Sequence, residues 1–177
     1  MGALAVCAQV SVPVPGSPVP QSLQTLAVVL VGAWLGPAPA AGAVLVYIGI
    51  GAAGLPVFAD GAGGLEHLRG ATAGYLAGFV VGAALMGWWV EGHDGESGKT
   101  LRPARRTGFA ALFLGAVAAH AVILGLGWAR LALMVGAGAA FAGGVAPFVI
   151  GGVAKSAVAA ALVTVGRRDS AGTLGLH

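Results

Sequence analysis

The sequence contains little charge. Only 8% of its 177 residues are Asp, Glu, Lys or Arg, whereas a soluble domain carries about 25%. The first 59 residues contain none of these four types, and the first charge in the chain is Asp60. Such a chain cannot cover itself with a solvated surface. This excludes a soluble enzyme, a nucleic-acid-binding protein and a disordered chain.

Cysteines and paired acids are scarce as well. Cys7 is the single cysteine, so the sequence offers neither a disulfide framework nor a cysteine-based metal site. The apolar segments contain no paired acids, metal-ligand constellation or activated nucleophile, and the pattern G-x-x-x-x-G-K-[ST] is absent. We therefore expect no cofactor and no metal, and a chain that cannot hydrolyse ATP by itself. An intramembrane enzyme is the remote alternative.

Apolar residues make up 58% of the sequence. They do not alternate with polar residues as in a membrane β-barrel, so the expected fold class is an all-α integral membrane protein. Because a span takes about 20 residues, the chain accommodates about six helices in one domain, residues 1–177. The expected helices are a short or truncated one before Pro13, then 22–36, 40–54, 73–90, 107–127 and 152–166, and segment 128–151 is expected to be re-entrant or loosely helical.

Basic residues predict the orientation. Four of them stand between residues 99 and 106, and Arg167 and Arg168 follow the last expected helix. Because cytoplasmic loops are enriched in Lys and Arg, both clusters are expected inside. The prediction is a multi-pass protein of the plasma membrane with a cytoplasmic C-terminus. The outward loops are then 13–21, 55–72 and 128–151.

Small residues predict close helix contacts. Gly74, Gly78 and Gly82 recur at every fourth position, and such spacing lets helix backbones approach closely in lipid. His120 is alone in its apolar segment, with no second ligand one turn away. We interpret it as a histidine that is hydrogen-bonded within the helix bundle.

Two residues near the expected outer ends of helices have two interpretations each. Lys155 is the only charge between Arg130 and Arg167, and it either extends to the interface or binds a ligand, as intramembrane ionisable residues usually do. Tyr75 is either an interfacial anchor or an aromatic wall with a hydroxyl group. With Gln24 on the same side, these residues favour an outward-open pocket for a small molecule.

Four ordered motifs resemble BioY, the biotin-binding S component of energy-coupling factor (ECF) vitamin transporters. Residues 19–26 (VPQSLQTL) are similar to the family's VPxTLQTL, residues 54–59 to GLPVFA, residues 70–76 (GATAGYL) to GPTGGYL, and residues 147–155 to PFxPGDxxK. The resemblance implies a six-helix S-component bundle that binds biotin on the outer side and delivers it inward. Its implied partners in the lipid bilayer are a transmembrane coupling protein and two ATPase subunits.

The resemblance also implies the site. Apolar walls would come from Phe58, Tyr75 and Phe148, and polar contacts from Gln24, Thr72 and Lys155, with the loop 13–21 as a lid. The family's acid in PFxPGDxxK is Gly152 here, and Asp60 is the candidate for a substitute acid. This departure leaves two alternatives open: an S component for a different vitamin, or a degenerate member that binds nothing.

Overall fold

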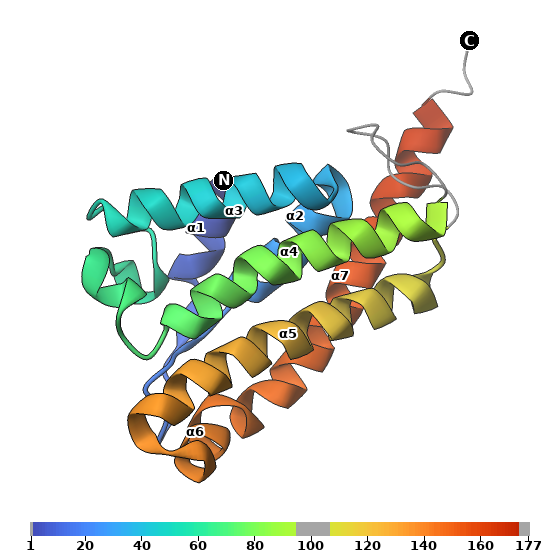
Figure 1. Ribbon diagram of the computed structural model, residues 1–177. Helices are drawn as coiled ribbons and strands as arrows, with labels where there is room; N and C mark the ends of the chain where they lie inside the picture. The colour runs from blue at the N-terminus through green and yellow to red at the C-terminus, as the bar shows by residue number, and fades with distance from the viewer. Residues whose placement is uncertain (1, 95–106, 174–177) are drawn as a thin grey trace.

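The computed structural model describes residues 2–94 and 107–173. Within them the chain is almost entirely helical, which confirms the all-α class (Figure 1). The α-helices are α1 (Gly2–Gln9), α2 (Gln24–Leu35), α3 (Pro37–Ala52), α4 (Ala73–Asp94), α5 (Phe109–Val135), α6 (Ala137–Gly144) and α7 (Ala146–Thr173). Two short strands, β1 (Ser11–Val12) and β2 (Gln21–Ser22), pair antiparallel. Two 3-10 turns, η1 (Ala59–Gly61) and η2 (Leu65–Leu68), lie between α3 and α4.

The six expected helices are present, and the first is short, at eight residues. The described residues contain a seventh α-helix, α6, so the predicted count of six is not confirmed. The expectation for segment 128–151 was wrong in its boundaries. Helix α5 continues to Val135, α6 follows after one residue, and α7 already begins at Ala146 rather than 152. Gly136 connects α5 to α6 with φ of 88°, a conformation that glycine adopts at no steric cost. Pro147 is accommodated because the first turn of a helix has no intrahelical partner for its N–H.

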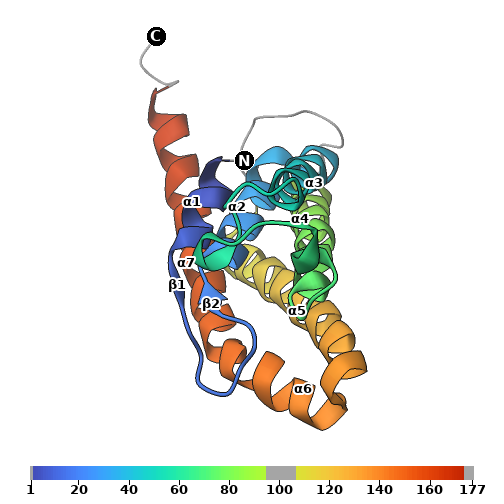
Figure 2. The ribbon, with the colours of Figure 1, turned by 90° about the vertical axis from the view of Figure 1, so that its left-hand side faces the viewer.

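Helices α4 and α5 lie side by side along most of their length (Figures 1 and 2). The predicted close contact of the glycines in α4 is confirmed. A Cβ atom at Gly78 would lie 2.8 Å from Ile123 Cα, and one at Gly82 would lie 3.0 Å from Ile123 Cγ1. Gly74 faces the backbone of Leu126 in the same way. Without side chains at these positions, the two backbones approach closely.

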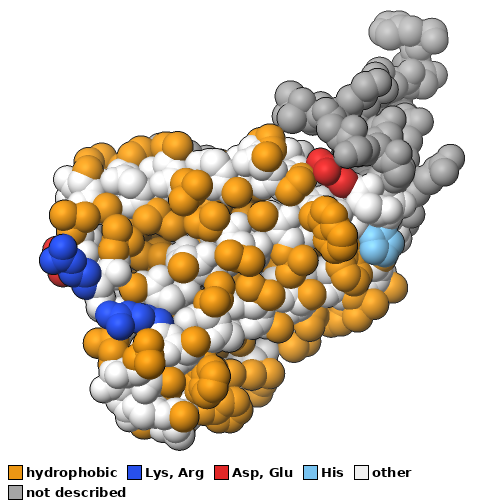
Figure 3. Space-filling view, viewed as in Figure 1, with side chains coloured by type: hydrophobic (Ala, Val, Ile, Leu, Met, Phe, Trp, Pro, Cys, Tyr) orange, Lys and Arg blue, Asp and Glu red, His pale blue; other side chains and the backbone are white. Residues whose placement is uncertain are grey.

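The surface of the bundle is that of a multi-pass membrane protein. Within residues 2–94 and 107–173, three helical stretches are long and apolar enough to cross a bilayer: Ala73–His93, Phe109–Val135 and Ala146–Arg167. Large apolar side chains such as Leu133 and Ile150 are more than 80% exposed. On the face shown in Figure 3, apolar side chains cover the flank and charged ones gather toward its two ends. Lipid is the environment in which such a surface is stable.

The residues that predict the orientation are only partly described. The basic cluster of residues 99–106 lies outside the described residues, as does the side chain of Arg168. The loop 55–72, with its two 3-10 turns, and the β1–β2 hairpin lie at the end of the bundle opposite to the C-terminal end of α4 (Figures 1 and 2). This grouping agrees with the prediction that residues 13–21 and 55–72 share one side of the membrane.

Candidate functional site

A cavity of about 300 Å³ opens among the β1–β2 hairpin, the loop 55–72 and helices α2, α4, α5 and α7. All seven predicted site residues line it, although they come from distant parts of the sequence. They are Gln24, Phe58, Asp60, Thr72, Tyr75, Phe148 and Lys155. The predicted lid also contributes, because Pro18, Val19 and Pro20 border the same cavity.

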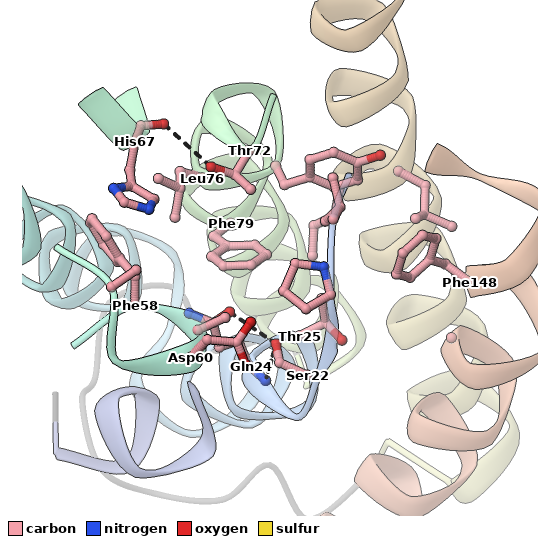
Figure 4. Close-up of a pocket in the computed structure, with 18 of the residues that line it drawn as sticks. Ser22, Gln24, Thr25, Phe58, Asp60, His67, Thr72, Leu76, Phe79 and Phe148 are labelled. Atoms are coloured by element: carbon pink, nitrogen blue, oxygen red, sulfur yellow. Dashed lines mark hydrogen bonds between the residues drawn. The ribbon is translucent and has the colours of Figure 1, made fainter. Parts of the chain in front are cut away.

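Aromatic rings form much of the wall. Phe58 and Phe148 lie on opposite sides of the space drawn in Figure 4, with Phe79 between them. The ring of Phe58 is 3% exposed and packs edge-on against Tyr47, with 5.7 Å between the ring centroids. It fits there because Gly51 leaves room for it: a Cβ atom at position 51 would overlap the Phe58 ring. The wall is therefore rigid and apolar, as the body of a small ligand requires.

Gln24 is held by a chain of hydrogen bonds. Ser22 Oγ donates to Gln24 Oε1 at 2.9 Å (Figure 4), and Gln24 Nε2 donates to the hydroxyl of Tyr47. Tyr47 in turn donates to the carbonyl oxygen of Val57 at 2.8 Å. This network orients the amide group of Gln24 and leaves one of its two N–H groups for a ligand.

Lys155 joins α7 to β2 and to α2. Its ammonium group donates to the carbonyl oxygen of Ser22 at 2.7 Å and to Thr25 Oγ1 at 3.1 Å. An ammonium group has three N–H donors, so one remains for an acceptor oxygen of a ligand in the cavity. The partly buried position is stable because two of the three donors are satisfied within the protein.

Tyr75 is part of the bundle and not an anchor at its surface. The residue is 6% exposed, and its hydroxyl donates to the carbonyl oxygen of Gly144 in α6 at 2.7 Å. Its ring lies against Gly127, where a Cβ atom would overlap it. The hydroxyl group is thus occupied within the protein, and the ring is what Tyr75 offers to the cavity.

Thr72 and Asp60 stand in the loop 55–72 that borders the cavity. Thr72 Oγ1 donates to the carbonyl oxygen of His67 at 3.3 Å (Figure 4). Asp60 accepts a hydrogen bond from Ser11 Oγ, which ties η1 to the hairpin. Among the described residues Asp60 forms no ion pair with Lys155. Nor do three His, Cys, Asp or Glu residues in that part of the chain gather closely enough to hold a metal ion.

Position 152 is open. Gly152 lines the cavity, and a Cβ atom there would meet only His120, at 3.6 to 3.8 Å, which is ordinary van der Waals contact. His120 is buried as expected, with Nδ1 at 2.9 Å from the carbonyl oxygen of Ala116. Gly152 therefore leaves room beside the imidazole ring for a Cβ atom in place of the absent acid.

The cavity also contains residues that sequence reasoning missed, among them Thr25, His67, Leu76, Phe79 and Ile123. Phe79 could have been predicted from the sequence, because it stands one helical turn after Tyr75 and so lies on the same face of α4. Thr25 follows Gln24 directly in a recognised motif. No sequence pattern indicates His67 or Ile123, since their positions at the cavity depend on how the loop 55–72 and α5 pack.

Comparisons with known proteins agree on one family. The BioY family profile matches residues 1–171. The probable biotin transporter BioY of Pyrococcus horikoshii is 34% identical over 154 residues, which cover 87% of this chain and 83% of that protein. The biotin transporter BioY of Rhizobium etli is 37% identical over 150 residues, 82% of this chain and 76% of that protein.

A solved structure shares the fold. It is the crystal structure of the S-component for biotin from an ECF-type ABC transporter, with a TM-score of 0.80. The similarity covers 94% of this chain and 86% of that chain, at 19% sequence identity. The helical arrangement in Figures 1 and 2 is therefore that of an S component.

Proposed function

The chain belongs to the BioY family, and we propose that it is the biotin-binding membrane subunit of a vitamin uptake system. In this proposal residues 1–177 form a single substrate-binding domain whose cavity is open to the outside of the cell. The observation that carries it is the convergence of all seven predicted site residues on one cavity. They come from motifs that are far apart in the sequence, and only the fold brings them together.

The chemistry of the cavity suits biotin. Biotin combines an apolar bicyclic body with a neutral ureido group and a carboxylate tail. The rings of Phe58, Phe79 and Phe148 provide an apolar wall for the body. Gln24 and Lys155 each retain an N–H donor for oxygen atoms of the ligand. A cavity with apolar walls and a few placed donors is typical of small-molecule sites.

Energy for uptake would come from other subunits. The sequence contains no phosphate-binding loop of the G-x-x-x-x-G-K-[ST] type, so ATP hydrolysis needs a partner. We infer that the partners are a transmembrane coupling protein and two ATPases of an ECF module. The C-terminus would then lie in the cytoplasm, in agreement with Arg167 and Arg168 at the end of the last apolar segment.

Equilibrium binding of labelled biotin to the purified chain in lipid nanodiscs tests the proposal. We expect saturable binding of one biotin that unlabelled biotin displaces and other vitamins do not. Biotin at 100 times its Kd should also stabilise the protein by about 2.7 kcal/mol, which a thermal unfolding assay detects. Undetectable biotin binding would remove the assignment, and displacement by another vitamin instead would establish a different substrate.

A further inference from the structure

The imidazole ring of His120 in α5 is hydrogen-bonded to its own helix and to α7. Its Nδ1 atom is 2.9 Å from the carbonyl oxygen of Ala116 in α5 and 3.1 Å from Ser156 Oγ in α7. Ser156 Oγ donates its own hydrogen to the carbonyl oxygen of Gly152, at 2.8 Å. Both neighbours of Nδ1 therefore present lone pairs, so Nδ1 carries a hydrogen. In the neutral ring Nε2 is then a hydrogen-bond acceptor.

The Nε2 atom of His120 lacks a partner. The residue is only 5% exposed, and Nε2 is buried without a hydrogen bond to any part of the chain that the structure describes. A buried polar atom in this state costs about 1–3 kcal/mol. Such a cost is unusual in a native protein and calls for an explanation.

One edge of the His120 ring, formed by Cβ, Cγ and Cδ2, borders position 152. The ring atom Cδ2, which is bonded to Nε2, lies 3.6 Å from the point where a Cβ atom of residue 152 would stand. His120 and Gly152 both line the cavity that contains the seven predicted site residues. The acceptor atom and the open space are therefore neighbours at one end of this cavity.

A second hollow borders the same two residues. It lies between α5, α6 and α7, has a volume of about 530 Å³ and is lined mainly by apolar side chains such as Trp128, Phe141 and Val149. Acyl chains of lipids, which surround this part of the molecule, have no hydrogen-bond donors. A polar ligand that donates to Nε2 is therefore expected in the outward cavity, which has the more polar lining, and not in this apolar hollow.

We propose that His120 is a specificity-determining contact that accepts a hydrogen bond from an N–H group of the ligand, in the space beside Gly152. The inference rests on the proposed function, and in biotin the group would be a ureido N–H. Lys155 follows Gly152 by three residues in α7, so a donor and an acceptor stand near the same end of the cavity. This pair matches a ureido group, whose carbonyl oxygen lies next to its N–H groups.

The first test compares biotin affinity in two substitutions of His120. Asn can still donate to the carbonyl oxygen of Ala116 but has no atom at the place of Nε2, whereas the longer Gln can bring an acceptor oxygen there. We expect His120→Asn to weaken binding about tenfold or more and His120→Gln to recover most of it. Unchanged affinity in His120→Asn, or no recovery in His120→Gln, would overturn the proposal.

The second test observes His120 in the unsubstituted chain and uses a variant only to assign its resonance. In a chain labelled with ¹⁵N histidine, the Nε2 resonance of His120 is identified by its loss in His120→Asn. Saturating biotin should move this resonance in the direction of a newly accepted hydrogen bond. A resonance that stays in place while biotin binds would overturn the assignment of His120 alone. Absence of biotin binding to the unsubstituted chain would overturn the proposed function as well.

Gly152→Ala is a variant in which a loss of biotin affinity is distinguished from a loss of stability. Its methyl group fits beside His120, and alanine is the better helix former, so thermal stability should be equal or higher. The methyl group nevertheless occupies the space proposed for the N–H group, and we expect affinity to fall about fivefold or more. Gly49→Ala in α3 is the control, because its Cβ atom would meet nothing within 4 Å. Equal affinity in the two variants would contradict the proposal.

Discussion

At the residue scale, the site is built from side chains that serve the protein and the ligand at once. Lys155 joins α7 to β2 through Ser22 and to α2 through Thr25, and it still has one donor for the cavity. Gln24 is fixed by Ser22 and Tyr47 in the same way. Groups held in place before the ligand arrives lose less conformational freedom on binding. The cavity is therefore preorganised, and substitutions in it should affect binding more than stability.

A comparison of Lys155→Met with Thr25→Val separates the two roles of the lysine. Methionine has a similar length and no charge, so the variant loses the donor that remains for a ligand together with the bonds to Ser22 and Thr25. Because a hydrogen bond to a charged group contributes about 1.5–3 kcal/mol, we expect biotin affinity to fall about tenfold or more in an equilibrium binding assay. Thr25→Val removes only one of the two hydrogen bonds that Lys155 makes within the protein. Its biotin affinity should stay within about threefold of that of the unsubstituted chain. Equal losses in the two variants would mean that Lys155 acts only by joining the helices.

The open position at Gly152 leads to a prediction of rescue. A Cβ atom fits there, and the family motif PFxPGDxxK has Asp at this position. The carboxylate of Gly152→Asp would accept an N–H group beside the ring of His120. In a His120→Asn background we therefore expect Gly152→Asp to restore at least about half of the lost binding free energy, measured by titration with biotin. A double variant that binds no better than His120→Asn contradicts this prediction.

At the element scale, contacts between helices depend on where glycines stand. Helix α4 approaches α5 closely because Gly74, Gly78 and Gly82 present no side chains to it. Tyr75, between the first two of these glycines, reaches α6 through Gly144 and borders the cavity. The spacing of α4 from α5 thus determines how wide the cavity is at the Tyr75 end.

Gly78→Ala tests this dependence. Its Cβ atom would lie 2.8 Å from Ile123 Cα, and because this neighbour is backbone, the two helices have to move apart. Overpacking of this kind costs about 1–3 kcal/mol, so the midpoint of thermal unfolding in detergent should fall. Gly42→Ala in α3, where nothing lies within 4 Å of the added atom, should leave it unchanged or raise it. A fall of the same size in both variants would show that the α4–α5 contact is not special.

At the scale of the whole molecule, the distribution of charge determines orientation. The apolar flank faces lipid, and the loop 55–72 with the hairpin forms the end at which the cavity lies. The basic cluster of residues 99–106 predicts that the opposite end is cytoplasmic. The cavity then faces outward, where a vitamin would be captured.

Cysteine labelling tests the orientation. In a Cys7→Ala background, Leu65→Cys stands on an exposed part of η2, since Leu65 is 58% exposed. An impermeant maleimide added to intact cells should label it and should not label Ser97→Cys, which becomes reactive after the membrane is permeabilised. The reverse pattern would overturn the proposed orientation and the outward-open cavity with it.

The sequence by itself determined the membrane class, the helices other than α6 and the glycine contacts of α4, and it proposed the seven candidate site residues. These are local properties: hydropathy, helix length, spacing and short motifs are all read within a few turns of the chain. The sequence did not show that α7 begins at Ala146, because the glycines and Pro147 of that segment are typical of a break when no neighbouring helix is considered.

Only the tertiary structure decided which polar groups remain free in the cavity. The scarcity of charge made Lys155 prominent, but its bonds to β2 and α2 follow from how α7 packs against them. His120 was expected to be satisfied within the bundle, and the structure shows that one nitrogen is and the other is not. A hydrogen-bond partner depends on distances between helices that are far apart in the sequence. The unpartnered acceptor beside Gly152 therefore becomes visible only after the helices are packed.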